Sequence, residues 1–169
     1  DTFEKVCRLA DVLKFFENDD IISCSLALKG GTAINLTIFN LPRLSVDIDL
    51  DYCRSIDREA MLADRDIIME KIGKYMAANG YSLSPKSKNY HALDSFVYEY
   101  VNCGGVKDNI KIEINYMLRC HILPVARSLS ISCLGFGADR IGKDVLGSVW
   151  RRTIFTRIDI WGNCGMCKC

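Results

Sequence analysis

The sequence predicts an α+β domain in which helices flank a mixed β-sheet. Three observations support this class: an N-terminal segment with apolar residues at three- and four-residue steps, strict alternation over residues 44–52, and two strand-like segments, SFVYEYVN at 95–102 and NIKIEINY at 109–116. Helices and strands alternate before the last two strands, an order expected of a mixed sheet. With 169 residues, 49% of them hydrophobic, the chain is long enough for one domain with a sizeable core.

The first half of the chain contains two predicted helices and a strand. An amphipathic helix is expected from Phe3 to Phe16, ending near the polar segment ENDD. Residues 22–28, ISCSLAL, predict a short buried strand, and residues 29–31 predict a turn. A second helix is expected from Thr32 up to the break at LPRL.

The middle of the chain contains an acidic strand, a long helix and a hairpin. In residues 44–52, LSVDIDLDY, the acids alternate with apolar residues, which predicts a strand with one acidic face. Asp57 is the expected N-cap of a helix that stops at Gly80. The strands at 95–102 and 109–116 are joined by a Gly-rich connection, and in the second strand Glu113 lies on the face opposite the isoleucines.

Charge and hydropathy exclude several classes of protein. Lysine and arginine number 22 against 21 acids, so no overall field attracts nucleic acid or an anionic membrane. No apolar stretch reaches the roughly 20 residues that span a bilayer, and the N-terminal segment has acids where a signal peptide has bases. We expect no membrane association and a cytoplasmic location. Because the first residue is Asp1 rather than Met, a fragment lacking its first residues is one interpretation.

The nine cysteines fall into two groups. Six stand singly among apolar residues and predict buried free thiols: Cys7, Cys24, Cys53, Cys103, Cys120 and Cys133. The other three, Cys164, Cys167 and Cys169, would need a fourth ligand such as His121 to hold zinc, and a single knuckle disfavours that site. Neither His91 nor His121 belongs to a nucleophilic triad pattern.

The segment LKGGTAINL is the first candidate for chemistry. Gly30 and Gly31, at a strand-to-helix turn, would let the backbone approach a ligand, and the helix N-terminus would favour a phosphate. Thr32 can cap that helix or bond the same phosphate. The alternative is a tight connection with a Thr cap and no ligand.

The segment VDIDL is the second candidate. Residues two apart on a strand lie about 6.5 Å from each other on one face, so Asp47 and Asp49 can both reach one divalent cation, for which Mg²⁺ or Mn²⁺ is the expected species. The alternative is a solvated polar face, although alternating acids repel one another and are poor strand formers.

Glu113 in KIEIN is the third candidate. A third carboxylate on a neighbouring strand would complete a site for two metals, one positioning a nucleoside triphosphate and one activating an attacking hydroxyl. The alternative is an ordinary exposed strand residue or an ion-pair partner of Lys111.

A Gly-Gly-Thr turn, an Asp-x-Asp strand and a later acid between β-branched neighbours resemble the nucleotidyltransferase superfamily. The segments LKGGTAINL and LPRLSVDIDLD are similar to the AbiEii/AbiGii toxin family, nucleotidyltransferases of abortive-infection toxin–antitoxin systems. The resemblance is specific over residues 27–51 and looser to about residue 125. It implies a nucleotidyltransferase fold, transfer of a nucleoside monophosphate from NTP to an acceptor such as tRNA or another RNA, and a separate antitoxin.

The resemblance also implies roles for individual residues. Gly31 and Thr32, with Gly30, would contact the triphosphate, and Asp47 and Asp49 would bind the metal, with Glu113 as third ligand. Three further residues within the motifs are candidates for phosphate contact or for bracing the acidic strand: Lys29, Arg43 and Ser45. For Arg43 the alternative is a surface partner of Asp51.

The C-terminal segment departs from the family pattern. The Ala-, Lys- and Leu-rich segment and the Arg-Asp-x-x-Asp-like helix that the family carries are not recognisable there. We therefore divide the chain into a nucleotidyltransferase domain at 1–134 and an atypical tail at 135–169, either disordered or the product of a frameshift near Gly135. The alternative function is a catalytically incomplete nucleotide-binding or partner-binding remnant of the family.

Overall fold

One mixed β-sheet organises the chain. The computed structural model describes residues 2–37, 47–117, 126–129 and 155–158. Its strands are β1 (Leu26–Lys29), β2 (Ile48–Tyr52), β3 (Ser82–Leu83), β4 (Lys88–Asn89), β5 (Leu93–Val101), β6 (Lys107–Asn115), β7 (Ala126–Leu129) and β8 (Phe155–Ile158). Its helices are α1 (Thr2–Asn18), α2 (Asp20–Ser25), α3 (Gly30–Thr37) and α4 (Arg58–Ala78).

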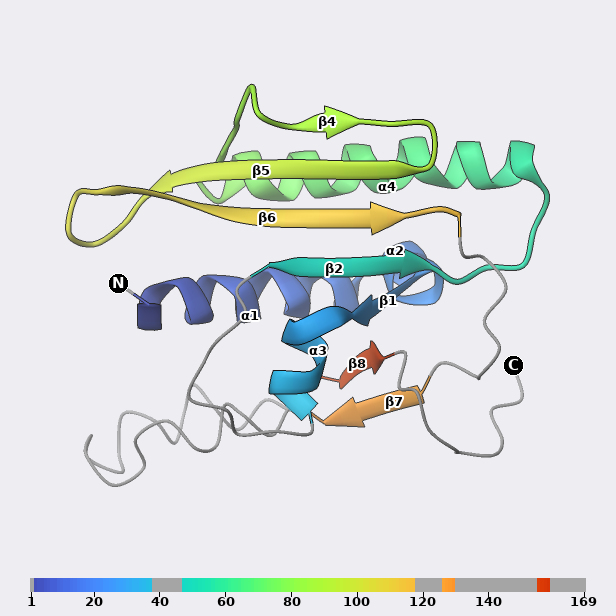
Figure 1. Cartoon of the computed structure of the whole chain (residues 1–169), viewed down its shortest axis with the longest axis horizontal. Helices are drawn as coiled ribbons and strands as arrows, with labels where there is room; N and C mark the ends of the chain where they lie inside the picture. The colour runs from blue at the N-terminus through green and yellow to red at the C-terminus, as the bar shows by residue number, and fades with distance from the viewer. Residues whose placement is uncertain (1, 38–46, 118–125, 130–154, 159–169) are drawn as a thin grey trace.

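The strand order defines the mixed sheet drawn in Figure 1. Across the described part of the sheet the order is β3-β5-β6-β2-β1-β8-β7, with β4 also paired to β5. The β1–β2 and β5–β6 pairs are antiparallel, whereas the β2–β6 and β1–β8 pairs are parallel. This confirms the predicted α+β class with a mixed sheet flanked by helices.

Helices α1 and α4 pack on one face of the sheet, behind the strands in Figure 1. The core beneath them includes Leu9 and Val12 of α1, Ile68 and Ile72 of α4, and the buried isoleucines of β6. Because alternate residues of a strand lie on opposite faces, the polar residues between these apolar ones lie on the other face of the sheet. The candidate site is on that polar face.

The predicted strand at residues 22–28 is wrong in its first half. Residues 20–25 form α2, and the strand begins at Leu26. Asp19 is the N-cap of α2, and its carboxylate accepts hydrogen bonds from the amides of Ile21 and Ile22 at 3.0 and 3.1 Å. This capping favours a helical turn within an apolar run that resembles a strand. The helix predicted from Thr32 begins two residues earlier, at Gly30.

The predictions for α4 and the hairpin are confirmed. Asp57 is the N-cap of α4 and accepts a hydrogen bond from the amide of Ala60, and Gly80 follows the helix with φ of 79°. Strands β5 and β6 pair along their whole length, and the isoleucines of β6 are buried as expected.

A buried ion pair fastens α4 to β5. The guanidinium of Arg65, 7% exposed, donates to both carboxylate oxygens of the fully buried Asp94, at 2.5 and 3.0 Å. It also donates to the carbonyls of Tyr90 and His91 and to Oδ1 of Asn89. Bidentate pairing and these further acceptors compensate the desolvation of both charges. Arg65 therefore holds the segment that contains β4 against the core.

Two sequence-based expectations concern thiols and membranes. The four described cysteines form no disulfide, as predicted. Their predicted burial is wrong, because Cys24 and Cys103 are exposed and Cys7 and Cys53 are only half-buried. Cys120, Cys133 and the cysteines of the last segment lie outside the described residues. Among the described helices, none is long and apolar enough to cross a membrane.

Replacing the N-cap of α2 tests why this segment is helical. Asp19→Ala removes the acceptor of two amides and the ion pair with Lys71, whose Nζ lies 2.6 Å from Asp19 Oδ2. We expect the free energy of unfolding, measured by urea denaturation, to fall by about 1 to 2 kcal/mol. Asp19→Asn is the matched control, because Asn caps equally well, and it should lose less than about 1 kcal/mol.

The same variants have an expected pH dependence. Burial raises the pKa of Asp19, but the Lys71 ammonium and the two amides outweigh it, and the net pKa is lowered. A lowered pKa stabilises the fold above the unfolded-state value of about 3.9, and this contribution is lost as the pH falls through the folded-state value. The difference between the wild type and Asp19→Asn should therefore shrink in acid. A constant difference from neutral pH to acid would contradict this assignment.

Candidate functional site

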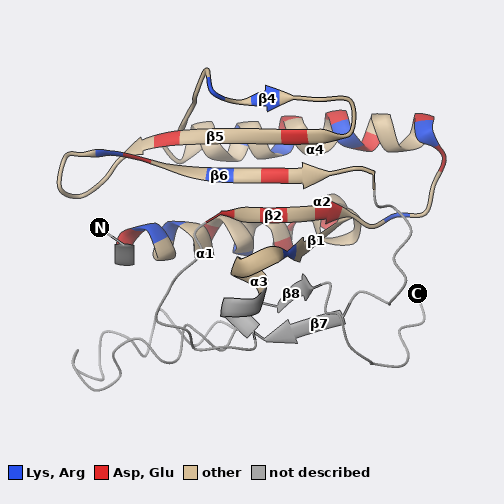
Figure 2. Ribbon diagram, in the orientation of Figure 1, with Lys and Arg blue, Asp and Glu red and all other residues tan. Residues whose placement is uncertain are grey.

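The polar face of the sheet carries a row of side chains from four adjacent strands. The register pairs Lys29 of β1 with Asp49 of β2, Asp49 with Glu113 of β6, and Glu113 with Ser95 of β5. Residues in register on neighbouring strands point to the same face, with backbones about 5 Å apart. Figure 2 shows the acidic segments of β2 and β6 next to each other. The structure thus brings together three of the predicted site residues, and sequence reasoning missed Ser95.

Asp49 lies at the centre of the row, and its surroundings disfavour its negative charge. Burial raises the pKa of Asp49, the negative charges of Glu113 and Asp47 raise it further, and Lys29 and Lys111 oppose the increase. Asp47 is exposed and directly precedes β2, so its carboxylate is close enough to act on Asp49. Like charges held this close favour a bound cation or a proton.

Glu113 is held in its charged form by two neighbours. Ser95 Oγ donates to Glu113 Oε1 at 3.0 Å, and Lys111 Nζ lies 2.9 Å from the same oxygen. Burial raises the pKa of Glu113, but these two contacts outweigh it and lower the pKa overall. The predicted ion pair with Lys111 is therefore present.

Lys29 braces the acidic strand. Its Nζ lies 2.5 Å from Oδ1 of Asp51, whose side chain is only 6% exposed. This is one of the two roles expected of Lys29, and contact with a phosphate stays a prediction. Asp51 is two residues after Asp49 on β2 and therefore lies on the same face, as expected. It is buried and paired, so the alternative of a solvated face does not describe it.

The Gly-Gly-Thr segment fits tightly against β2. Gly30 has φ of 74°, and a Cβ atom at this position would clash with the Asp49 carboxylate. Thr32 is 1% exposed, and its hydroxyl donates to the main-chain oxygen of Asp47 at 2.5 Å. The threonine hydroxyl therefore fixes the start of β2 against α3. The exposed Gly31 lies at the N-terminus of α3, the end of a helix whose positive dipole favours an anion.

The donor set fits a magnesium ion that is shared with substrate phosphates. No group of three or more Asp, Glu, His or Cys side chains in the described ranges is arranged to hold a metal ion by itself. Mg²⁺ is usually bound by one or two carboxylates together with phosphate oxygens and water, rather than by an all-protein cage. The register that places Asp49 beside Glu113 on the polar face, with Asp47 directly before β2, is the observation that favours a cation here.

Some predicted residues lie outside the described ranges. Arg43 and Ser45 belong to the segment 38–46, and the zinc alternative rests on His121 and the last cysteines. The roles expected of these residues stay predictions, as does the division at residue 134. Strand β8, which falls within the predicted tail, pairs with β1 through Ile158 and Leu28.

A mixed sheet with a Gly-Gly-Thr helix start packed against two acids of the next strand is the arrangement of the nucleotidyltransferase class. The family model "Nucleotidyl transferase AbiEii toxin, Type IV TA system" matches residues 15–139, well over half of the 169 residues. The chain belongs to this family, which confirms the resemblance seen in the sequence.

The chain is also similar to a solved structure, the crystal structure of JHP933 from Helicobacter pylori. The two sequences are 22% identical, the TM-score is 0.46, and the match covers 73% of this chain and 46% of the other. The chain thus spans less than half the length of that protein. A search of curated proteins finds no match.

Gly30→Ala tests the close approach of α3 to Asp49. A positive φ costs an L-residue about 1 to 2 kcal/mol, and the clash with the carboxylate adds to this. We expect a lower urea midpoint than the wild type. The matched control is Gly73→Ala within α4, where the added Cβ meets no atom within 4 Å beyond its chain neighbours and the backbone of its own helix. This variant should gain about 0.5 to 1 kcal/mol in the free energy of unfolding. Equal midpoints for wild type and Gly30→Ala would refute the proposed constraint.

A second pair of variants tests the brace between Lys29 and Asp51. Lys29→Met leaves a buried carboxylate without its partner, and we expect a loss of about 3 kcal/mol in the free energy of unfolding. The double variant Lys29→Met/Asp51→Asn removes both charges and should recover most of that loss. If the double variant is no more stable than Lys29→Met, the ion pair is not the source of the stability.

Proposed function

We propose that the chain is the metal-dependent nucleotidyltransferase part of a type IV toxin. It would transfer a nucleoside monophosphate from NTP to an RNA acceptor such as tRNA, in the cytoplasm, and a separate antitoxin would oppose it. The toxin class and the antitoxin follow from membership of the family. The observation that carries the reaction is the pairing of Asp49 with Glu113 beside the Gly-Gly-Thr start of α3.

The N-terminus of α3 and the neighbouring carboxylates would make different contacts to a bound NTP. The amides at the N-terminus of α3 are suited to the triphosphate, because the backbone at Gly30 and Gly31 is exposed. Asp47, Asp49 and Glu113 would hold Mg²⁺ or Mn²⁺ through carboxylate oxygens, together with oxygens of the triphosphate. When bound, the cation would neutralise phosphate charge and lower the pKa of the attacking hydroxyl.

The transfer itself is a displacement at the α-phosphorus. The acceptor hydroxyl oxygen forms the new bond, the bond to the bridging oxygen of pyrophosphate breaks, and the hydroxyl proton passes to solvent. The chain's contribution is position and charge. Thr32 and Lys29 fix the acidic strand through Asp47 and Asp51, and Ser95 fixes Glu113.

The alternative is a remnant that binds nucleotide without turnover. It is favoured by the C-terminal segment of the sequence, in which the Ala-, Lys- and Leu-rich segment and the Arg-Asp-x-x-Asp-like helix of the family are not recognisable. The two functions differ in one observable, because both bind a magnesium–nucleotide complex and only the enzyme transfers label.

The test is incubation of the whole chain with Mg²⁺, each α-labelled NTP in turn, and total bacterial tRNA. We expect label on RNA, and we expect Asp49→Asn to reduce it on the order of 100-fold, because an electrostatic contact to the reacting centre is lost. The matched control is Glu70→Gln, the same carboxylate-to-amide change on the exposed surface of α4. It should transfer label like the wild type.

Melting temperatures, measured with and without Mg²⁺ and NTP, separate nucleotide binding from transfer. Asp49→Asn should raise Tm in the absence of metal, because like-charge repulsion is relieved. Mg²⁺ with NTP should raise the Tm of the wild type more than that of the variant. Nucleotide-dependent stabilisation with no label on any acceptor would support the remnant, and transfer that survives in Asp49→Asn would refute the proposed site.

A further inference from the structure

Lys88 extends the polar row of the site by one strand. It is in register with Ser95 of β5, and Ser95 is in register with Glu113 of β6. The next residue, Asn89, accepts a hydrogen bond from Arg65 of α4, so Asn89 faces the helices. Because neighbouring strand residues point to opposite faces, Lys88 lies on the polar face with the acids.

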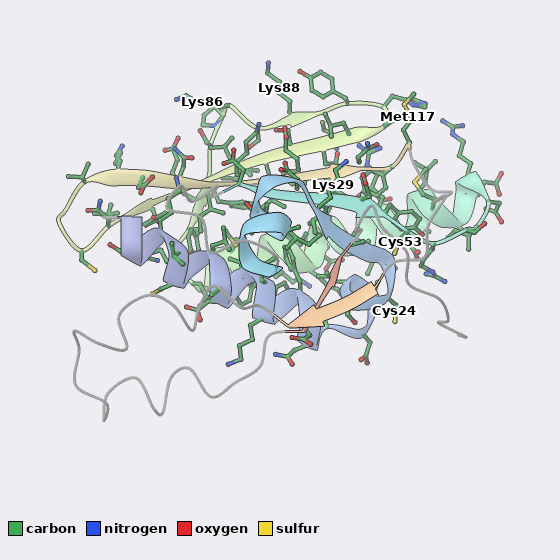
Figure 3. The ribbon with its side chains drawn as sticks, turned by 60° about the horizontal axis from the view of Figure 1, so that its bottom comes forward. Cys24, Lys29, Cys53, Lys86, Lys88 and Met117 are labelled. Carbon is green, nitrogen blue, oxygen red and sulfur yellow. The ribbon has the colours of Figure 1, made fainter. Side chains whose placement is uncertain are left out.

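Two further exposed residues lie beside Lys88. Lys86 is exposed in the turn before β4, and neither lysine has an ion-pair partner among the described residues. Tyr90 is 50% exposed, and its amide donates to the carbonyl of Leu93 at 2.8 Å. This bond continues the β4–β5 ladder, so Tyr90 lies on the same face as Lys88. Figure 3 shows Lys86 and Lys88 together at one edge of the molecule, away from Lys29.

Lys86, Lys88 and Tyr90 lie away from the place proposed for the NTP. Adjacent strands are about 4.8 Å apart, so the backbone of Lys88 lies about 10 Å from that of Glu113 and about 14 Å from that of Asp49. Gly30 and Gly31 lie on the other side of Asp49, at the end of β1. An NTP held between α3 and the acids would point away from β4. An anion at Lys88 would then belong to the other reactant.

We propose that Lys86, Lys88 and Tyr90, here called the β4 surface, bind the acceptor as a single-stranded nucleic acid. This inference rests on the proposed function, because the acceptor must reach the carboxylates. Two unpaired ammonium groups can each neutralise a phosphate, and an exposed tyrosine ring offers a face on which a base can stack. The 10 Å from Glu113 corresponds to about three nucleotides at a stacked rise of about 3.4 Å.

The geometry favours nucleic acid over a protein acceptor. The β4 surface combines cations with an aromatic ring at the edge of the sheet, the pairing used by proteins that bind single strands without reading their sequence. The long-range charge of the chain is close to neutral, at +1, so binding must come from such a local surface. The β4 surface is also in register with the acids, which would direct the end of the strand toward Asp49.

The test measures binding of a short fluorescein-labelled single-stranded RNA to the whole chain by fluorescence anisotropy, over a series of salt concentrations. The variants are Lys88→Ala, Lys86→Ala/Lys88→Ala, Tyr90→Ala and Tyr90→Phe. The matched control is Lys74→Ala, which removes one exposed lysine from α4. Because all these side chains are exposed, urea midpoints should be unchanged, and this is measured for each variant.

Each lost phosphate contact should reduce the slope of log K against log salt by about 0.7, so the double variant should lose about 1.4. Tyr90→Ala should weaken binding at least about fivefold, whereas Tyr90→Phe should bind like the wild type. Lys74→Ala should change neither slope nor affinity. Unchanged slope and affinity in the double variant would overturn the proposal, as would a wild type that does not bind the RNA.

Transfer assays separate this proposal from the proposed function. The double variant should raise KM for the RNA acceptor while KM for NTP stays unchanged. If Asp49-dependent label appears on RNA with wild-type KM in the double variant, the transferase stands and the β4 surface does not bind the acceptor. If label appears only on protein, the nucleic acid acceptor is refuted at this surface. If no label transfers but RNA binding depends on the lysines, the β4 surface stands and the transferase fails.

Discussion

The register of β2 between β1 and β6 is the constraint on which the site depends. Ile48 and Leu50 are buried beneath the helices, and Asp49 between them therefore lies on the polar face. A slip of one residue would move Asp49 into the core and expose both apolar neighbours, at a cost of several kcal/mol for the buried side chains alone. The packing that stabilises the core thus also aligns Lys29, Asp49 and Glu113 across three strands.

The aligned acids are held together against their own repulsion. Asp49 and Glu113 are in register on adjacent strands, so each side chain brings a negative charge to the same part of the polar face. The pKa of Asp49 is raised by burial and by this repulsion, while the pKa of Glu113 is lowered by Lys111 and Ser95. The two carboxylates therefore differ in how their surroundings treat the negative charge. Neighbouring groups stabilise the charge of Glu113, whereas the surroundings of Asp49 disfavour its charge and so favour a bound cation.

The sequence alone predicts the long helices and strands, because their apolar residues recur at a regular spacing over many positions. The helix after Asp57 and the strands β5 and β6 are long and were predicted, as were the acids of β2. Helix α2 has six residues within an apolar run, and its cap at Asp19 was not used as a signal. Strands β3 and β4 have two residues each and show no period. The contacts of Ser95 depend on the pairing of distant strands, and no local pattern contains that information.

The buried pair of Arg65 and Asp94 connects the core to the edge of the polar row. Asp94 is on β5 between Leu93 and Ser95, and the guanidinium that pairs with it also binds Asn89 and the carbonyl of Tyr90. Lys88 is therefore anchored by its neighbour Asn89, although β4 has only two residues. A strand this short contributes little ladder energy of its own, so its position is set by the ion pair beneath it. The same buried core therefore positions both Asp49 and Glu113 at the centre of the row and Lys88 at its edge.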